Sequence, residues 1–386
     1  MPLARPLCSF LAKTKAKWNA HTPCFVVRTD QLVRMLGHIK KHLPGEILYS
    51  LKTNPDPVIA RMVAEAGCGF LLSSIEETER LLATTNVERC RLMFQSPSLT
   101  VVHFARLKAL GVSRFIVDSA SQLELILGSL EGFARKPELL VRVNTGVSAR
   151  SPELKYSSDS FLGFPLAEVL PVFRRLGRLR AEGRLTLGLH NHLLSQNTSL
   201  ALWRKNLATL AGFVAELLRQ GIELDLVDFG GGYPIRYGRH PVPELATIAR
   251  EVRRATARMR RVLPSLRVAF EPGRKVVGES ISLVTRVNHV KRFLGTTVAI
   301  LDCSLYNASL DTLIVDLHLP VERLGARRRR KQACVLRGST PDSLDVFAQR
   351  VSLDLAAGDT VVFRHAGAYA FASDFIGLRK PEHIFT

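Results

Sequence analysis

Short apolar runs alternate, up to Glu271, with longer stretches in which apolar side chains recur every three or four positions. A short apolar run bounded by turn residues is typical of a strand buried on both faces, and the longer period is typical of a helix that buries one face. The apolar runs predict strands at 47–51, 69–72, 91–94, 114–117, 139–144, 186–192, 224–229 and 267–271.

The stretches between these runs predict helices at 56–66, 75–83, 99–110, 119–130, 165–181, 198–220 and 243–262. Several end at a glycine, which favours a left-handed cap. Eight strands that alternate with helices over this length indicate a (β/α)8 barrel. The alternative, a doubly wound sheet, would need a phosphate-binding loop after its first strand, and the sequence has none there.

The pattern changes after Glu271, where few helical stretches occur. Strands are predicted at 283–293, 297–302, 332–337 and 360–364, and a further one at 24–28, before the barrel. We therefore expect two domains. Residues 29–282 form the cofactor-binding barrel, and residues 1–28 together with 283–386 form a β-sandwich or β-barrel-like domain.

The bulk composition restricts the class of protein. The chain has 386 residues, 46% of them hydrophobic, and no apolar run of about 18 residues, so we expect no contact with a membrane. The N-terminal segment lacks the apolar core and the cleavage site of a signal peptide. The six cysteines form no C-x-x-C pair, which argues against a disulfide framework and favours reduced thiols in a cytoplasmic protein.

The formal net charge of +20 raises the question of a polyanionic partner. The arginines, however, are spread along predicted helices such as 243–262, and only Arg327 to Lys331 forms a continuous basic block, between two predicted strands. No recognition helix with interleaved aromatic residues accompanies it. We interpret the block as a solvated loop and expect a small-molecule substrate and no nucleic-acid partner.

Side chains with unusual chemistry fall at the carboxyl ends of the predicted strands, where (β/α)8 barrels carry their active sites. Lys52 follows the first strand, in Y-S-L-K-T-N-P. A lysine against an apolar strand end is poorly solvated, which lowers its pKa and makes the amine nucleophilic. The alternative is a surface lysine whose stem covers apolar surface.

Two histidines, His190 and His192, end the sixth strand. Side chains alternate along a strand, so both lie on one face, and a metal-binding pair is one interpretation. Few carboxylates stand at the other strand ends, so we expect no metal. A flat imidazole stacked on a planar cofactor accounts for the position better.

The last two strands end in a glycine turn and a carboxylate. Gly230, Gly231 and Gly232 let backbone N–H groups approach a phosphate, although the turn does not match the dinucleotide pattern G-x-G-x-x-G. A buried Glu271 needs a cationic partner, which is either Arg274 or the protonated ring nitrogen of pyridoxal phosphate. Together with the lysine and the histidine ring, these features indicate pyridoxal phosphate.

On these motifs the chain resembles the fold-type III pyridoxal-phosphate-dependent decarboxylases, the ornithine/diaminopimelate/arginine decarboxylase family. The resemblance extends over about 24–377 and is carried by Y-S-L-K-T-N-P, G-L-H-N-H-L-L-S-Q, D-F-G-G-G-Y-P, E-P-G-R, G-S-T-P-D-S-L-D and G-A-Y-A. It implies an alanine-racemase-like (β/α)8 barrel with a C-terminal β domain, and a homodimer with its active sites at the interface.

The resemblance also implies residue roles. Lys52 is the Schiff-base lysine. The implied cofactor-binding residues are Lys52, Arg142, His192, Ser195, Gly230, Gly231, Gly232, Glu271, Gly273, Arg274 and Tyr369. The implied catalytic residues are Lys52, His192, Glu271 and Asp342, and we expect Asp342 and Asp316 to contact the substrate.

Three positions depart from the family pattern. Pro341 stands where the family has a cysteine associated with protonating the product carbon, Leu194 replaces a glycine, and Leu71 replaces an aspartate. Asp342 matches the position at which the family binds a distal amino group, which favours a substrate with a cationic tail. Diaminopimelate decarboxylases carry a glutamate at that position.

The sequence thus predicts decarboxylation of a basic or diamino acid, or of a conjugate of one, to an amine and CO2. The departures favour specialised secondary-metabolite biosynthesis over housekeeping polyamine synthesis. One alternative is an amino-acid racemase or epimerase on the same fold, although such enzymes typically present arginine, where this chain has Glu271, to the ring nitrogen. The other is a non-catalytic regulatory homologue, motivated by Pro341 and opposed by the presence of Lys52.

Overall fold

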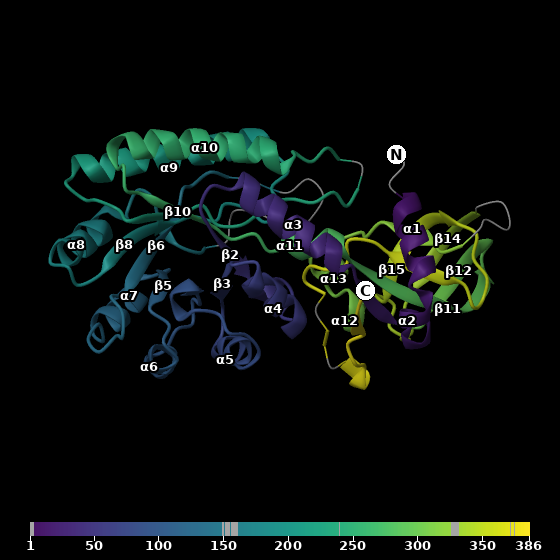
Figure 1. Cartoon of the computed structure of the whole chain (residues 1–386). Coiled ribbons are helices and arrows are strands. Elements are labelled where there is room, and N and C mark those ends of the chain that lie inside the picture. The colour runs from purple at the N-terminus through teal and green to yellow at the C-terminus, as the bar shows by residue number, and fades with distance from the viewer. Residues whose placement is uncertain are drawn as a thin grey trace.

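A closed barrel of eight parallel strands forms one half of the molecule, as the computed structural model shows (Figure 1). The structure describes residues 4–148, 150, 155, 161–238, 240–325, 332–370, 372–373 and 375–386. The strand order is β5-β4-β3-β2-β10-β9-β8-β6, and β6 pairs with β5 to close the ring. The strands are β2 (Glu46–Ser50), β3 (Gly69–Leu72), β4 (Leu92–Phe94), β5 (Arg114–Val117), β6 (Glu138–Asn144), β8 (Thr186–His190), β9 (Leu226–Asp228) and β10 (Arg267–Phe270), with the short β7 (Phe164–Pro165) beside β6. The predicted (β/α)8 barrel is confirmed.

Helices cover the outside of the barrel. They are α3 (Thr29–His42), α4 (Pro57–Glu65), α5 (Ile75–Thr84), α6 (Val101–Ala109), α7 (Ala120–Leu127), α8 (Leu170–Ala181), α9 (Leu200–Arg219) and α10 (Leu245–Val262), with the short α11 (Arg274–Val277) after β10. Several begin at a residue whose side chain accepts a hydrogen bond from a backbone N–H in the first turn: Asp56, Ser74, Thr100, Ser119 and Ser199. Such caps satisfy donors that have no partner inside the helix. The helix α3 was not predicted from the sequence.

Apolar side chains fill the barrel and hold the helices against it. Leu48, Leu71, Met93, Ile116, Leu140, Leu226 and Ala269 form one cluster contributed by the strands alone. Their sequence neighbours, such as Tyr49 and Phe70, belong to the larger cluster that includes the helices. The alternation explains why each strand is apolar on both faces. The barrel interior is therefore a packed core.

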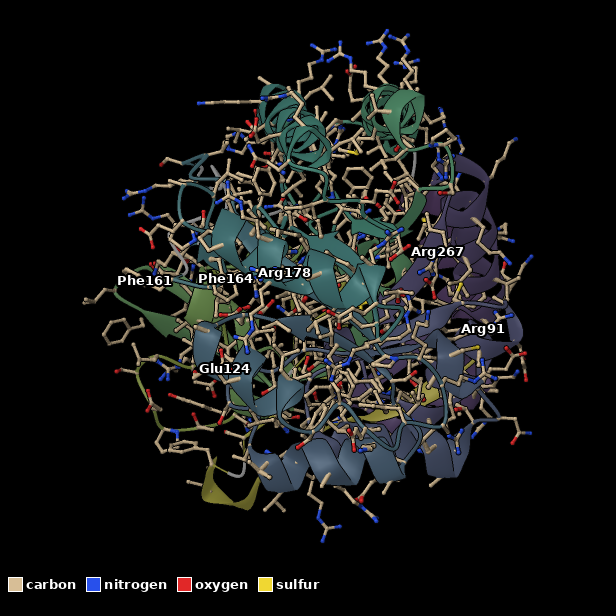
Figure 2. All side chains as sticks on the ribbon, turned by 90° about the vertical axis from the view of Figure 1, so that its left-hand side faces the viewer. Arg91, Glu124, Phe161, Phe164, Arg178 and Arg267 are labelled. Carbon is tan, nitrogen blue, oxygen red and sulfur yellow. The ribbon has the colours of Figure 1, made fainter. Side chains whose placement is uncertain are left out.

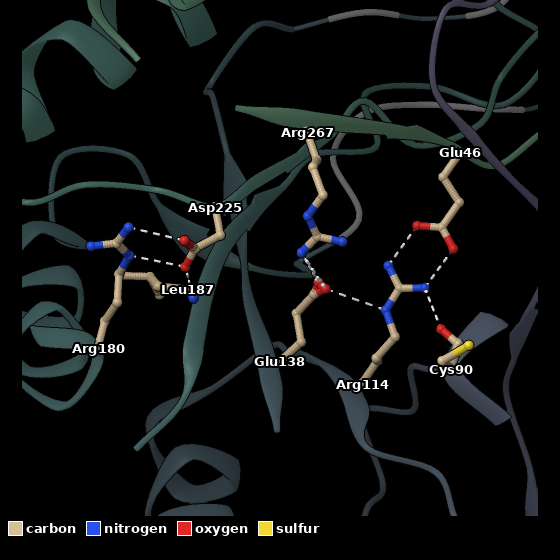
Figure 3. Close-up of polar contacts among 8 residues, drawn as sticks. All are labelled: Glu46, Cys90, Arg114, Glu138, Arg180, Leu187, Asp225 and Arg267. Atoms are coloured by element: carbon tan, nitrogen blue, oxygen red, sulfur yellow. Dashed lines mark hydrogen bonds and ion pairs between the residues drawn. The ribbon is translucent and has the colours of Figure 1, made fainter. Parts of the chain in front are cut away.

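An ion-pair network lies at the amino-terminal end of the barrel strands (Figure 3). Arg114, the first residue of β5, donates to both carboxylate oxygens of Glu46 at 2.6 and 2.7 Å and lies 3.3 Å from Glu138. Arg267 donates to Glu138 at 2.7 Å. Buried charges persist only when they are paired in this way. In barrels of this class the amino-terminal end serves stability, so the reacting groups belong at the opposite end.

A second sheet, mostly formed by the C-terminal part of the chain, packs beside the barrel (Figure 1). It contains β1 (Cys24–Val27), β11 (Ile281–Phe293), β12 (Thr296–Leu301), β13 (Val321–Arg323), β14 (Gln332–Arg337), β15 (Val346–Leu353), β16 (Thr360–Phe363) and β17 (Glu382–Phe385). The helices α1 (Ala4–Lys13), α2 (Lys15–Trp18), α12 (Leu305–Ala308) and α13 (Asp311–Val315) accompany it. The predicted second β unit is confirmed, but β13, β15, β17 and the N-terminal helices were not predicted.

The basic residues that raised the question of a polyanion lie on the outer surface of the helices (Figure 2). Arg253, Arg254 and Arg258 on α10 are exposed, whereas Val252 and Met259 of the same helix are buried. These arginines therefore form the solvated face of an amphipathic helix. The block at 327–331 lies outside the described residues. No helix in the described part of the chain is long and apolar enough to cross a bilayer.

Candidate active site

A cavity of about 300 Å³ opens at the carboxyl ends of the barrel strands. Most of the residues that the sequence analysis selected line this cavity. They are Lys52, Arg142, His192, Ser195, Gly231, Gly232, Glu271, Gly273, Arg274 and Tyr369. Ser50, Gln95 and Leu162 also line it and were not selected, although Ser50 ends β2 and Gln95 directly follows β4.

Lys52 lies in a short 3-10 turn, Leu51–Thr53, that follows β2. Its side chain lines the cavity and is exposed, whereas Leu51 and Thr53 on either side are buried. The expectation that a strand end buries this lysine is therefore wrong, because the turn carries the side chain out of the barrel wall. What the structure supports is an amine presented to the cavity.

Glu271 follows β10 and is buried in the cavity wall. Burial raises the pKa of this carboxyl to about 7, although Lys52 and Arg142 act in the opposite direction. His190 Nε2 lies 3.4 Å from the carboxylate. His190 Nε2 is also 3.4 Å from Oε1 and the Asp228 carboxyl lies beside Glu271, but no N–H group of the described residues donates a hydrogen bond to Oε1. A buried oxygen without a donor is costly, so this atom fits a site for a cationic or N–H group.

Arg274, the alternative partner for Glu271, is engaged elsewhere. Its guanidinium donates to Tyr237 Oη at 2.6 Å and lies 3.6 Å from Asp311 Oδ2. The guanidinium carbon is also 4.9 Å from the centre of the Tyr369 ring. Burial raises the pKa of Asp311 to about 6 while Arg274 opposes the rise. The Arg274 interpretation of Glu271 is therefore wrong.

His192 is held between the sixth and seventh strand ends. Its Nδ1 accepts a hydrogen bond from Gly231 N at 3.2 Å, and its Nε2 is 3.3 Å from Ser195 Oγ. Desolvation, aided by Arg142, lowers the pKa of His192 to about 3, so the ring is neutral with its proton on Nε2. His190 lies beside Glu271 and does not line the cavity. Among the described residues no three potential ligands gather as a metal site would require.

The glycine turn after β9 can be formed only without side chains. Gly230 and Gly232 have φ of +65° and +92°, and an added Cβ would lie 2.4 Å from Asn191 O and 2.2 Å from Leu194 O. Asp228 Oδ1 accepts a hydrogen bond from Gly230 N at 2.8 Å. The turn therefore brings backbone to the edge of the cavity at Gly231 and Gly232, as an anion-binding turn does.

Arg142 lies two residues before the end of β6, lines the cavity wall and forms an ion pair with Asp118 at 3.5 Å. The two departures in the barrel, Leu71 and Leu194, are both buried and line the same cavity. The wall of the cavity is therefore apolar at these two points.

Asp342 and Asp316 do not line the cavity of their own chain. Asp342 lies in the turn between β14 and β15, where its Oδ1 accepts a hydrogen bond from Leu344 N at 2.7 Å. Asp316 is exposed, has a φ of +59° and pairs with His318 at 3.3 Å. Their contact with a substrate stays a prediction, and the resemblance places Asp342 in the site of a partner subunit.

A lysine amine, a glycine turn and a buried carboxylate around one cavity fit an enzyme that uses a phosphorylated, nitrogen-containing ring as cofactor. Residues 29–278, more than half of the chain, match the family model described as "Pyridoxal-dependent decarboxylase, pyridoxal binding domain". The chain belongs to the pyridoxal-dependent decarboxylase family, and its cofactor is pyridoxal phosphate.

Relatives resemble the chain over most of its length. It is 28% identical to a diaminopimelate decarboxylase of Pseudomonas aeruginosa over 85% of the chain and 78% of the relative. It is 24% identical to a lysine/ornithine decarboxylase of Selenomonas ruminantium over 94% of the chain and 88% of the relative. The fold is similar to that of a lysine/ornithine decarboxylase of Vibrio vulnificus complexed with putrescine, with a TM-score of 0.85 and 22% identity over 100% of this chain and 99% of that one. It is also similar to that of a diaminopimelate decarboxylase of M. jannaschi, with a TM-score of 0.86 and 20% identity over 97% of this chain and 89% of that one.

Proposed function

We propose that the protein holds pyridoxal phosphate on Lys52 and removes the α-carboxylate of a basic or diamino acid as CO2. The observation that carries this proposal is Glu271, a carboxylate that lines the cavity, is only 4% exposed and has an oxygen, Oε1, to which no N–H group of the described residues donates a hydrogen bond. A cation beside it would satisfy that oxygen and lower the raised pKa, because an opposite charge favours the ionised form. The protonated ring nitrogen of pyridoxal phosphate is such a cation.

The other lining residues fit the rest of the cofactor. The neutral His192 ring offers a flat face, and the backbone of Gly231 and Gly232 fits a phosphate together with Ser195 and Tyr369. Gly230 and Gly273 shape the two turns, and Arg274 adds positive charge on the same side. Arg142 supplies a second buried cation.

Bound pyridoxal phosphate supplies an electron sink for the bond that breaks at the α-carbon. An ionised Glu271 would hold the ring nitrogen of the cofactor in its protonated form. Lys52 would hold the cofactor through Nζ, and when it is free in the cavity its ammonium form would return a proton to the product carbon. Pro341 cannot do so, since it has neither a thiol nor a backbone N–H.

Reconstitution with the cofactor tests the proposal. The wild-type protein should turn yellow with pyridoxal phosphate and release CO2 from at least one member of a panel of diaminopimelate, lysine, ornithine, arginine and their conjugates. Lys52→Ala should abolish both the colour and the release. A wild-type protein that stays colourless, or one that never releases CO2, would contradict it.

The same assay separates the alternatives. A racemase or epimerase would change optical rotation without releasing CO2, and a regulatory homologue would turn over no amino acid. The carboxylate at Glu271 supports decarboxylation, because it favours a protonated ring nitrogen and thus a strong electron sink.

The substrate class and the assembly are proposed together. Each relative named above acts, by its name, on an amino acid with a second amino group, which an acidic side chain can bind. We propose a homodimer in which the partner's Asp342, with Asp316 nearby, reaches the substrate. Exposed apolar side chains near these residues support a partner: Ile314 (56%), Leu344 (63%) and Ile376 (64%). The oligomeric state in solution, measured by light scattering, tests this.

The domain division and the cellular compartment are also proposals. Division into 29–282 and into 1–28 with 283–386 is supported by the two separate sheets, which are β2 to β10 and β1 with β11 to β17. A cytoplasmic location is supported by Cys24, Cys68, Cys90, Cys303 and Cys334, which are all free thiols. Limited proteolysis and thiol labelling in cells test the two proposals.

A further inference from the structure

Residues 54–56, which follow Lys52, contact β17, the last strand of the chain. β17 pairs in parallel with β1, and Thr386 N donates to Val27 O at 2.9 Å. The pairing places the C-terminus between the barrel and the second sheet (Figure 1). It also packs His383, whose side chain is only 8% exposed, against residues 54–56.

His383 is fixed on three sides. Its Nδ1 lies 3.1 Å from Asp56 Oδ2, and its Nε2 lies 3.4 Å from Asn54 Nδ2. A neutral ring that donates from Nδ1 to the carboxylate and accepts at Nε2 from the amide satisfies both contacts. The ring also stacks on Phe25, with centroids 5.2 Å apart and planes at 27°.

Asp56 carries this contact to helix α4. Its Oδ1 accepts hydrogen bonds from Val58 N at 2.8 Å and Ile59 N at 3.3 Å, which caps the first turn of the helix. The two carboxylate oxygens therefore divide between the helix and His383. The start of α4 cannot shift without breaking one of the two sets of contacts.

Asn54 carries the contact to the cavity. Its Nδ2 also donates to Gly367 O at 3.0 Å, and its own N donates to Leu51 O, which spans the turn that holds Lys52. Thr53 O in turn accepts from Tyr369 N at 2.8 Å. The two segments that present Lys52 and Tyr369 to the cavity are thus joined at Asn54, where His383 is bound.

We propose that His383 is a positioning residue for the cofactor lysine. Through Asp56 and Asn54 it holds the turn that presents Lys52, although it does not line the cavity itself. The inference rests on the proposed function, in which Lys52 carries pyridoxal phosphate. A group that must form and release a bond needs placement to about 0.5 Å, so loosening the turn should weaken the hold on the cofactor.

The test compares three variants. His383→Ala removes both polar contacts. His383→Asn keeps an amide near the position of Nδ1. Glu382→Gln is the matched control, since Glu382 is the preceding residue of the same strand, is 77% exposed and contacts only His21 at 3.8 Å among the ion pairs of the described residues. The measurements are the dissociation constant for pyridoxal phosphate, the fraction of Lys52 that borohydride labels with the cofactor, and the melting temperature.

His383→Ala should raise the dissociation constant by about tenfold and lower the labelling of Lys52, since Asp56 Oδ2 loses its contact and the buried Asn54 amide loses one of its two. His383→Asn should recover part of the loss, and it carries the test if the alanine variant does not fold. Glu382→Gln should match the wild type. A His383→Ala protein with a lower melting temperature but with wild-type cofactor affinity and wild-type labelling of Lys52 would overturn this inference and leave the proposed function intact. A wild type that takes up no cofactor would overturn it together with the proposed function.

Discussion

Replacing Gly232 by alanine should damage the phosphate turn in a way that can be sized from the structure. Gly232 has a φ of +92°, and a left-handed backbone costs a residue with a side chain about 1–2 kcal/mol. The new Cβ would lie 2.2 Å from Leu194 O, so that carbonyl has to move by about 1 Å to reach an ordinary contact. We expect a combined cost of about 3 kcal/mol, equivalent to a factor of about one hundred or more.

The cost can appear in either of two measurements. If the turn keeps its shape, the free energy of unfolding falls, and if the turn moves, the dissociation constant for pyridoxal phosphate rises. Urea unfolding and a cofactor titration followed by absorbance measure the two. Gly212→Ala in α9 is the control, because a Cβ there meets nothing within 4 Å, and it should stabilise the helix by about 0.5–1 kcal/mol. A Gly232→Ala protein with wild-type unfolding and wild-type cofactor affinity would refute the reasoning.

Three further predictions concern Glu271, the ion-pair network at Arg114 and the pairing of Lys52 with Asp342. Burial raises the pKa of Glu271 from 4.5 to about 7, so the folded, cofactor-free protein binds the proton more tightly than the unfolded chain and loses stability as the pH rises from 4.5 to 7. Glu271→Gln should remove that loss, on the order of 3 kcal/mol, in urea unfolding at pH 5 and pH 7.5. Arg114→Leu leaves the half-buried Glu46 without its partner and the buried Glu138 with Arg267 alone, so it should lower the free energy of unfolding by about 3 kcal/mol; the folded protein should keep its cofactor affinity. Finally, if the proposed homodimer forms, Lys52→Ala and Asp342→Ala proteins, each inactive alone, should regain activity when mixed, because a mixed dimer then contains one intact site.

The barrel could be predicted because its strands are buried on both faces and its helices on one. Elements that lack such a pattern were missed. β17 has only four residues, of which Glu382 is exposed, and β13 is partly buried throughout. The helix α3 was missed although Leu32, Leu36 and Ile39 are buried at helical spacing, so a usable signal was present there.

The candidate site was predictable where strand ends converge, which is how Lys52, Glu271 and the glycine turn came together. The partners of Arg274 were not, because Tyr237 and Asp311 come from a loop and from the short helix α13, far apart along the chain. No local pattern links them to the eighth strand. His383 is a similar case, since its contact with Asp56 joins residues at opposite ends of the sequence.

Asp342 differs from these cases, because its own chain already holds it away from the cavity. The buried Asp345 accepts hydrogen bonds from Thr340 N and Leu305 N at 3.0 and 2.9 Å, which fixes the turn on both sides, and Arg337 donates to Asp342 O. Moving Asp342 into the cavity of its own chain would break these bonds, whereas a second copy can meet the turn as it stands. If the mixed Lys52→Ala and Asp342→Ala proteins stay inactive, Asp342 either acts within one chain after such a rearrangement or does not act at all.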